Sequence, residues 1–242
     1  MTDRRHTQTD DEFIAEDLEQ MLAAKNYNAW LYSLVEPYFG KNLIEIGAGI
    51  GTVTQKIIQR DVHITVVEPN KNCQEYLTKK FSDDRNFSLI PAKIEECKKN
   101  NNLHEKFDTL ICINVLEHIQ DDLDSVLTFS NLLKKDGCAL IIVPALQILY
   151  GPIDKSVGHY RRYSKKDLKV LFSASPFKIE KMHYFNIIGA IGWFFNSHIL
   201  KIESQKRSQI SFIDKIIPSL SAIEAVIHPP FGMSLFLVVR KK

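Results

Sequence analysis

The sequence predicts an α/β fold with a doubly wound, mostly parallel sheet of seven strands. Short apolar runs rich in β-branched residues alternate with segments of helical periodicity, as in parallel strands joined by crossover helices. The first run, Asn42 to Ile46, leads directly into a turn with three glycines. The length of 242 residues suits one sizeable domain. We therefore expect a single domain over residues 1–242.

Composition and charge narrow the class of protein. The 45% apolar and 25% charged residues are ordinary for a soluble globular chain, and the formal net charge of +2 gives no electrostatic argument for a nucleic-acid partner. Residues 1–13 lack the apolar core of a signal peptide, and no apolar run reaches the roughly 18 residues of a membrane span. We expect a cytoplasmic monomer or homodimer without nucleic acid, for which peripheral membrane contact remains open.

Cysteine and histidine spacing predict neither disulfides nor a metal. Cys73, Cys97, Cys112 and Cys138 form no Cys-x-x-Cys pair, and two of them lie in apolar strand-like runs. Buried free thiols in a reducing compartment are therefore expected. No spacing of carboxylates and histidines indicates a metal site, so none is predicted.

Helices are expected before the first strand. Residues 1–10 are polar and expected to be disordered, whereas 11–39 have helical periodicity, with a second segment from Tyr27 to Val35 that Pro37 should end. We assign residues 1–40 to an N-terminal helical lid. Tyr27 and Trp30 could close over a ligand, or could pack the helix onto the sheet.

The segment from Asn42 to Thr54 holds the main candidate site. A strand, a tight glycine turn and the expected helix from Thr52 to Ile58 expose backbone N–H groups to a ligand. The G-x-G-x-G spacing differs from the dinucleotide pattern, and a carboxylate two residues before the first glycine suits an ammonium or sulfonium better than a pyrophosphate. The segment resembles the first motif, E/D-x-G-x-G-x-G, of class I S-adenosylmethionine-dependent methyltransferases. The matching residues are Glu45, Gly47, Gly49 and Gly51, with Ala48 inside the turn.

The next two strands, expected at 62–67 and 87–91, add cofactor candidates. The second strand ends in Glu68 and Pro69, about 20 residues beyond the glycine turn, where one carboxylate can accept hydrogen bonds from both ribose hydroxyls. NAD enzymes use the same device, so Glu68 indicates an adenosine cofactor in general. The resemblance implies that Glu68 holds the ribose and that Lys93 and Ile94 lie near the adenine, although Lys93 replaces the usual acidic or polar residue.

The fourth strand, Phe107 to Ile113, runs into the sequence NVLEH, which resembles the fourth motif of the same family. The resemblance implies that Asn114, Val115 and Glu117 lie beside the cofactor. The resemblance also implies that His118 faces the acceptor. His118 is a candidate general base, because the ordinary pKa of a histidine lies near physiological pH. Alternatively, His118 only packs the start of the next helix.

A helix at 123–133 and a fifth strand at 138–143 precede a polar and aromatic segment, residues 150–163. Such a density of hydrogen-bonding side chains in a loop favours function over packing. It resembles the D…GH-x-RRY stretch of a methyltransferase subgroup often found with glycan and natural-product assembly enzymes. We expect His159 or Tyr160 to accept or relay a proton, unless the segment is a salt-bridged anchor. The expected acceptor-binding residues are Asp154, Arg161, Arg162 and Tyr163.

The remaining segments complete the domain. We expect a helix at 165–172 with Ser164 as N-cap, and a strand at 177–184 that ends the cofactor-binding core, 41–184. Residues 185–231 form an unusually long helical insertion or cap before the last strand, 232–242. Two helices that cover the sheet edge or form a dimer contact are expected, the alternatives being an apolar acceptor pocket or docking to a membrane face.

The resemblance implies a transferase that moves a methyl group from S-adenosylmethionine to an oxygen or nitrogen, leaving S-adenosylhomocysteine. The expected acceptor is a small molecule, a sugar or a lipid-linked compound. One alternative is an NAD(P)-dependent oxidoreductase, which Glu45 and the glycine spacing oppose. The other is a non-catalytic, regulatory relative, which the complete first motif and the crowded polar rim oppose.

Overall fold

The computed structural model describes residues 24–196, 207–227 and 229–242. Its strands form one seven-stranded sheet in the order β3-β2-β1-β4-β5-β7-β6, in which β7 alone is antiparallel to both its neighbours. The predicted fold class is confirmed. The strands are β1 (Asn42–Ile46), β2 (His63–Val67), β3 (Phe87–Ile90), β4 (Phe107–Ile113), β5 (Leu133–Pro144), β6 (Phe177–Phe185) and β7 (Ser234–Lys241).

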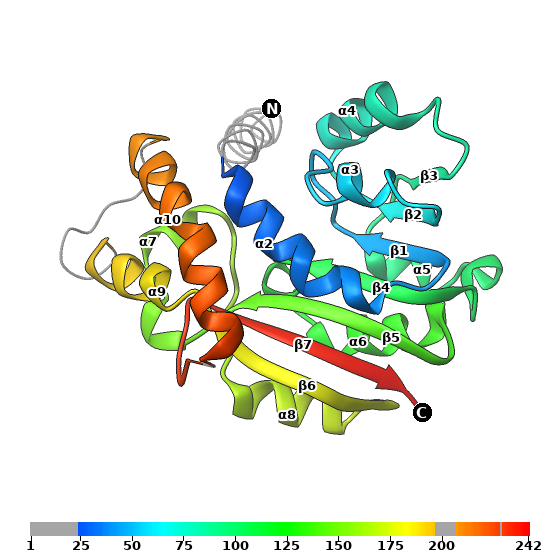
Figure 1. Cartoon of the computed structure of the whole chain (residues 1–242). Coiled ribbons are helices and arrows are strands. Elements are labelled where there is room, and N and C mark those ends of the chain that lie inside the picture. The colour runs from blue at the N-terminus through cyan, green and yellow to red at the C-terminus, as the bar shows by residue number, and fades with distance from the viewer. Residues whose placement is uncertain (1–23, 197–206, 228) are drawn as a thin grey trace, which may run out of the picture.

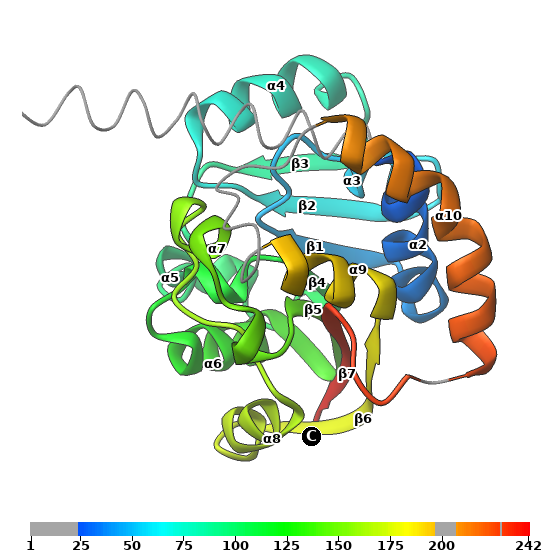
Figure 2. The ribbon, with the colours of Figure 1, turned by 90° about the vertical axis from the view of Figure 1, so that its left-hand side faces the viewer.

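Helices cover both faces of the sheet (Figure 1). One face carries α2 (Lys25–Val35), α3 (Thr54–Ile57), α4 (Lys71–Phe81) and α10 (Arg207–Val226); the other carries α5 (Ile94–Cys97), α6 (Asp122–Leu132) and α8 (Lys165–Ser173). Figure 2 shows α7 (Pro152–Ser156) and α9 (Ile187–Phe194) in front of the strand ends. Short 3-10 helices occur at η1 (Glu36–Tyr38), η2 (Asn101–Leu103), η3 (Leu116–His118) and η4 (Gln147–Leu149).

Two hydrophobic cores, one on each face, hold these layers together. Successive side chains of a strand point to opposite faces, so Leu43 of β1 joins the core under α2 and Ile44 joins the core under α6. Phe129 of α6 and Phe172 of α8 are almost completely buried in the second core. Full burial of one such side chain contributes roughly 1.5–3 kcal/mol, so the sheet is anchored from both sides.

Several predicted boundaries change in the structure. The helix expected at 52–58 is only α3, because the glycine turn continues through residue 53. The α-helix ends at Val35 before Pro37, as expected, and Pro37 lies in the first turn of the short η1 that follows, where its missing N–H costs nothing. β5 begins at Leu133 rather than at the expected residue 138, because Leu133 pairs with Phe107 of β4. The expectations for residues 1–23 lie outside the described residues.

All four cysteines are buried free thiols, as expected. Ser164 accepts a hydrogen bond from the Asp167 N–H and is the predicted N-cap of α8. Within the described ranges, no helix is both long enough and apolar enough to cross a membrane.

Candidate active site at the carboxyl ends of the strands

The glycine turn follows β1 and is held against the end of β2. The Gly47 N–H donates to the Val67 carbonyl at 2.8 Å. Gly47, Gly49 and Gly51 have φ values of 67°, 55° and 75°, a left-handed conformation that costs glycine little. A Cβ on Gly47 would lie 2.5 Å from Cγ2 of Val115, so space as well as conformation requires glycine there.

Glu45 lies beneath this turn, with only 5% of its surface exposed. Its Oε2 accepts a hydrogen bond from the Thr54 hydroxyl at 2.6 Å. Burial raises the pKa of Glu45 to about 7; the hydrogen bond from Thr54 opposes this rise and the nearby Glu68 adds to it. The carboxyl group can therefore change its charge near neutral pH.

Glu68 connects the end of β2 to the glycine turn. Its two carboxylate oxygens accept from the N–H groups of Gly49, at 2.8 Å, and Asn70, at 2.9 Å. Burial raises the pKa of Glu68, and these two hydrogen bonds oppose the rise. The carboxylate thus lies beside the turn, where a bound ribose would meet it in the predicted arrangement. Its neighbour Pro69 is exposed.

The adenine candidates begin the next helix of the opposite layer. Lys93 is the N-cap of α5, and its backbone N–H donates to Oε2 of Glu96 at 2.9 Å. Ile94 is buried in the core. Their contact with adenine stays a prediction.

The end of β4 brings a buried carboxylate to the same edge. Asn114 adopts a left-handed conformation, with φ of 52°, and its N–H donates to the Ile142 carbonyl at 2.9 Å. Two residues after Val115, Glu117 is completely buried, and neither of its carboxylate oxygens has a hydrogen-bond partner in the described part of the chain. Burial raises the pKa of Glu117 to about 7, with His159 the largest opposing influence.

His159 is held by a buried carboxylate. Its Nδ1 lies 2.8 Å from Oδ1 of Asp154, which also accepts from Nε of Arg162 at 2.8 Å. Burial opposes ionisation of Asp154, yet the hydrogen bonds from His159 and Arg162 lower its pKa overall. An ionised carboxylate only accepts hydrogen bonds, so Nδ1 carries the proton and Nε2 of the neutral ring holds a lone pair. Nε2 lies 3.9 Å from Oε1 of Glu117.

His118 completes this group, which we call the Glu117–His118–His159 cluster. Its ring lies edge-on to that of His159, with 4.6 Å between the ring centroids. Desolvation of the ring and the neighbouring His159 lower the pKa of His118, although the residue as a whole is exposed. One donor atom from each of the three side chains lies within 4.8 Å of the others.

Other residues of the 150–163 segment make contacts within the protein. Arg162 is 3% exposed, and its guanidinium lies 4.7 Å from the centroid of the Trp193 ring and donates to Asp154. The hydroxyl of Tyr163, also buried, donates to Asp122 at 2.9 Å. These side chains and Asp154 were expected to contact the acceptor. In the structure all three side chains are buried and hydrogen-bonded within the protein, and their contact with an acceptor stays a prediction.

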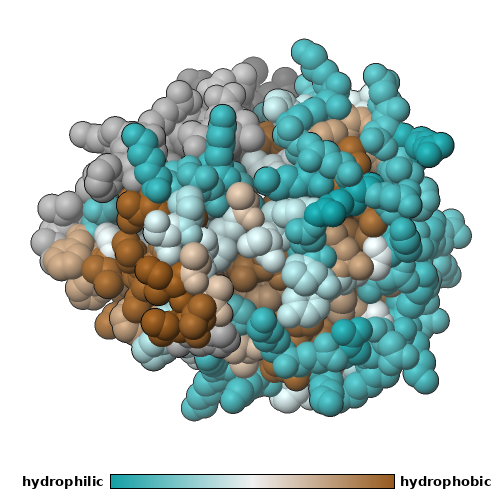
Figure 3. Space-filling view, viewed as in Figure 1, coloured by the Kyte–Doolittle hydropathy of each residue, from teal (hydrophilic) through white to brown (hydrophobic). Residues whose placement is uncertain are grey.

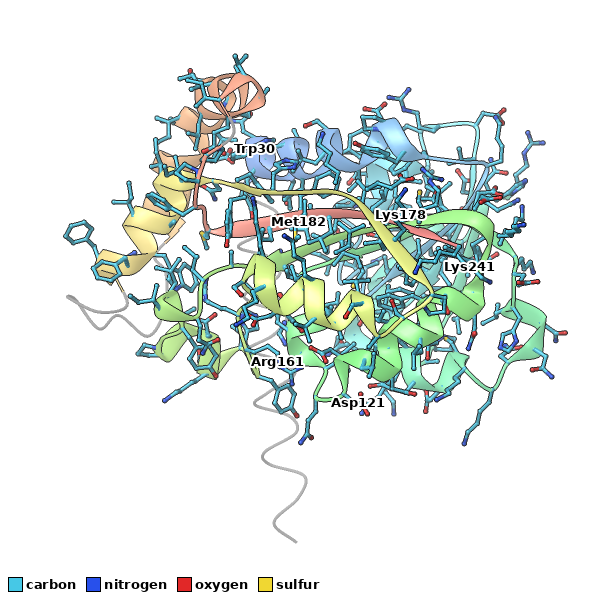
Figure 4. All side chains as sticks on the ribbon, turned by 90° about the horizontal axis from the view of Figure 1, so that it is seen from below. Trp30, Asp121, Arg161, Lys178, Met182 and Lys241 are labelled. Atoms are coloured by element: carbon cyan, nitrogen blue, oxygen red, sulfur yellow. The ribbon has the colours of Figure 1, made fainter. Side chains whose placement is uncertain are left out.

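Arg161 and Tyr160 lie nearer the surface. Arg161 forms an ion pair with Asp122 at 2.6 Å and donates to the Gln120 carbonyl at 2.7 Å. Figure 4 shows it beside Asp121, the residue that precedes α6. Tyr160 is 55% exposed, and its backbone N–H donates to the carbonyl of Glu117. Contact of either side chain with an acceptor stays a prediction.

Residues 5–201 match the model of the methyltransferase domain family. A curated relative, the ubiquinone biosynthesis O-methyltransferase of Actinobacillus pleuropneumoniae, is 27% identical over 103 residues, which are 41% of this chain and 44% of that protein. A second, ribosomal RNA small subunit methyltransferase A of Legionella pneumophila, is 34% identical over 58 residues, 24% and 23% of the two chains. The matches thus span less than half the length of these curated relatives.

The chain belongs to the methyltransferase domain family. Its fold is that of the class I S-adenosylmethionine-dependent methyltransferases, as the resemblance implied. The crystal structure of the Burkholderia thailandensis 1,6-didemethyltoxoflavin-N1-methyltransferase, solved with 1,6-didemethyltoxoflavin and S-adenosylhomocysteine, superposes with a TM-score of 0.61. That match is at 14% identity and covers 100% of this chain and 91% of that one.

α2 carries the two aromatic candidates for cofactor contact, Tyr27 and Trp30. Trp30 is 6% exposed and packs edge-on against Phe185, with 5.1 Å between the ring centroids, so it has the packing role that was the alternative expectation. Its contact with a cofactor stays a prediction. Tyr27 reaches further, since its hydroxyl is hydrogen-bonded to Ser234 and its pKa is raised by burial and, to a smaller degree, by Glu117. Contact of Tyr27 with a cofactor stays a prediction.

Proposed function

We propose that the chain transfers the methyl group of S-adenosylmethionine to an oxygen or nitrogen of a small-molecule, sugar or lipid-linked acceptor. The carrying observation is that His159, oriented through Nδ1 by Asp154 and 3.9 Å from Glu117, lies at the same edge of the sheet as the glycine turn. Val115 connects the two, because it contacts Gly47 and stands two residues before Glu117. A methyl donor held at the turn would therefore point toward the cluster.

The proposed reaction requires little covalent chemistry from the protein. The acceptor atom attacks the methyl carbon, the C–S bond breaks, and its electron pair stays on sulfur as a neutral thioether. Alignment of the two reactants and exclusion of water supply most of the acceleration. A hydroxyl acceptor must also lose its proton, and the side chains of the cluster are the groups within the site that can promote that loss.

An apolar surface beside the site favours an acceptor with an apolar part. Trp193 of α9 donates its indole N–H to the Leu149 carbonyl at 3.0 Å, which fixes α9 beside the segment that carries His159. Figure 3 shows a hydrophobic surface over α9 and α10. Its exposed apolar side chains include Ile188, Ile191, Phe194, Phe195, Ile213 and Ile223. Among the expected acceptors, this surface supports a lipid-linked or apolar aromatic compound over a free sugar.

A nucleic acid is the alternative acceptor that the experiment must distinguish. One similar protein is named a ribosomal RNA methyltransferase and another a tRNA U34 carboxymethyltransferase, the latter from Photobacterium profundum. The near-neutral net charge therefore does not justify the expected absence of nucleic acid.

The test is methyl transfer from isotopically labelled S-adenosylmethionine by the full chain. Apolar phenols, lipid-linked alcohols and amines, free sugars and short RNAs are offered separately, and products are identified by mass spectrometry. We expect labelled product from an apolar hydroxyl or amine, reduced by about 100-fold or more in His159→Ala and unchanged in His63→Ala, an exposed residue at the start of β2. Labelled RNA alone would overturn the acceptor class, and cofactor binding without any transfer would favour the regulatory alternative.

A further inference from the structure

We propose that the Glu117–His118–His159 cluster binds a divalent transition-metal ion of the Zn²⁺ class, with one coordination position left open for the acceptor. Metal binding by this cluster does not depend on the proposed function. Its catalytic use rests on the proposed function.

The first argument is the state of Glu117. A carboxylate buried away from water is costly unless hydrogen bonds or a cation compensate for the lost hydration. Glu117 is 0% exposed, and both its oxygens lack a hydrogen-bond partner in the described residues. Asp154, equally buried, shows the contrast, because His159, Arg162 and the Gly151 N–H all donate to it. Glu117 is therefore the carboxylate of this site that needs a ligand.

The second argument is the orientation of His159. A histidine that binds a metal through one nitrogen commonly donates the other ring N–H to a carboxylate, which fixes the tautomer and the ring plane. Asp154 makes this contact at Nδ1, and the buried Arg162 in turn fixes Asp154. Nε2, the ring nitrogen that Asp154 leaves free, lies 3.9 Å from Oε1 of Glu117, whose carboxylate has no hydrogen-bond partner among the described residues.

The third argument is distance. Ligands bonded to Zn²⁺ at about 2.0–2.2 Å lie roughly 3–4 Å from one another. Oε1 of Glu117 and Nε2 of His159 are 3.9 Å apart, and all three donor atoms lie within 4.8 Å. The upper limit of 4.8 Å exceeds the spacing around Zn²⁺, and His118, an exposed residue on η3, has room to move closer.

The donor set selects the class of metal. Two imidazoles and one carboxylate make a common catalytic zinc site, which leaves a fourth position open. Mg²⁺ and Ca²⁺ prefer oxygen ligands throughout, so this set disfavours them. An acceptor hydroxyl bound at the open position would release its proton to solvent, and the resulting oxygen lone pair would form the bond to the methyl carbon. The C–S electron pair would remain on sulfur.

The test is direct titration of the chelator-treated full chain with Co²⁺ and then Zn²⁺, without cofactor or acceptor. Co²⁺ reports four- or five-coordination through its visible absorption, and calorimetry gives the affinity and stoichiometry for Zn²⁺. We expect one ion per chain, bound at least about 10-fold more weakly by Glu117→Gln, His118→Ala and His159→Ala, and about 10–100-fold more weakly by Asp154→Asn, which removes the orienting carboxylate. His63→Ala, whose histidine lies outside the cluster, should bind normally.

Three outcomes would overturn the inference. They are the absence of stoichiometric binding, binding that Glu117→Gln and His118→Ala leave unchanged, and six-coordinate Co²⁺ spectra that indicate only surface contacts. Folding of each variant is checked by its thermal transition, and His118→Ala, a change at an exposed residue, keeps the test valid if a buried variant fails to fold. Methyl transfer that persists in metal-free protein would overturn the metal's catalytic use alone, leaving the proposed function intact.

Discussion

Replacement of Glu45 by Gln should change how the stability of the protein depends on pH. Burial raises the pKa of Glu45 from its ordinary value of 4.5 to about 7, so the folded chain holds this proton more tightly than the unfolded chain does. The stabilising contribution is complete below about pH 4.5 and is lost as the pH rises to about 7. At ~1.4 kcal/mol per pH unit, the loss is roughly 3 kcal/mol. Glu45→Gln stays neutral and can still accept from Thr54, so it should escape this loss.

Urea unfolding of the ligand-free protein at a series of pH values measures the effect. The difference in unfolding free energy between wild type and Glu45→Gln should change by roughly 3 kcal/mol between about pH 4.5 and 7.5, with Glu45→Gln favoured at the higher pH. The matched control is Glu75→Gln, which changes an exposed carboxylate on α4 and should show no such dependence. A difference that stays flat for Glu45→Gln would refute the account of its burial and charge.

Three further changes test other parts of the site. Glu68→Gln should lose a hydrogen bond at the glycine turn and weaken S-adenosylhomocysteine binding by roughly 1.5–3 kcal/mol in calorimetry; an unchanged affinity would mean that the ribose is held elsewhere. Asp154→Asn should lower the unfolding free energy by about 3–5 kcal/mol in urea, because it leaves Arg162 buried without its partner. Asp61→Ala, which breaks an exposed ion pair with Lys41, should have no measurable effect on the unfolding free energy. If Asp154→Asn and Asp61→Ala lowered it equally, burial would not explain the contribution of Asp154. Gly47→Ala should destabilise the chain by at least about 1–2 kcal/mol, because it forces a left-handed residue against Val115. Gly192→Ala, whose Cβ meets open space in α9, should stabilise the chain by about 0.5–1 kcal/mol. A Gly192→Ala variant less stable than Gly47→Ala would contradict the packing of the glycine turn.

The sequence predicted the sheet well because buried parallel strands leave a direct signal. β1 and β4 begin and end at the predicted residues, and both lie among buried neighbours on each side. The glycine turn was equally predictable from the sequence, since left-handed backbone conformations favour specific residue types. Local chemistry fixes such features, so local sequence predicts them.

Contacts between distant segments escaped prediction. Glu224 of α10 accepts from the N–H groups of Asn186 and Ile187 and so caps the start of α9, 38 residues earlier in the chain. Asp122 accepts a hydrogen bond from the hydroxyl of Tyr163, which lies 41 residues later in the chain. Neither pairing has a local pattern, because each depends on how complete elements pack together.

The polar cluster was predicted only in part. His118 and His159 were singled out from the sequence, whereas the burial of Asp154 and Arg162 in the 150–163 segment was not expected. Density of polar residues does not distinguish an exposed contact from a buried network. That the Glu117 carboxylate has no hydrogen-bond partner within the described ranges is likewise a three-dimensional property, which spacing along the chain does not encode.

The most direct test of the central claim is calorimetric titration of the full chain with S-adenosylhomocysteine, S-adenosylmethionine, NAD and NADP. The glycine turn with Glu45 and Glu68 predicts micromolar binding of both adenosyl compounds, weakened in Glu68→Gln, and no binding of either nicotinamide dinucleotide. Heat released with NAD and none with S-adenosylhomocysteine would contradict it.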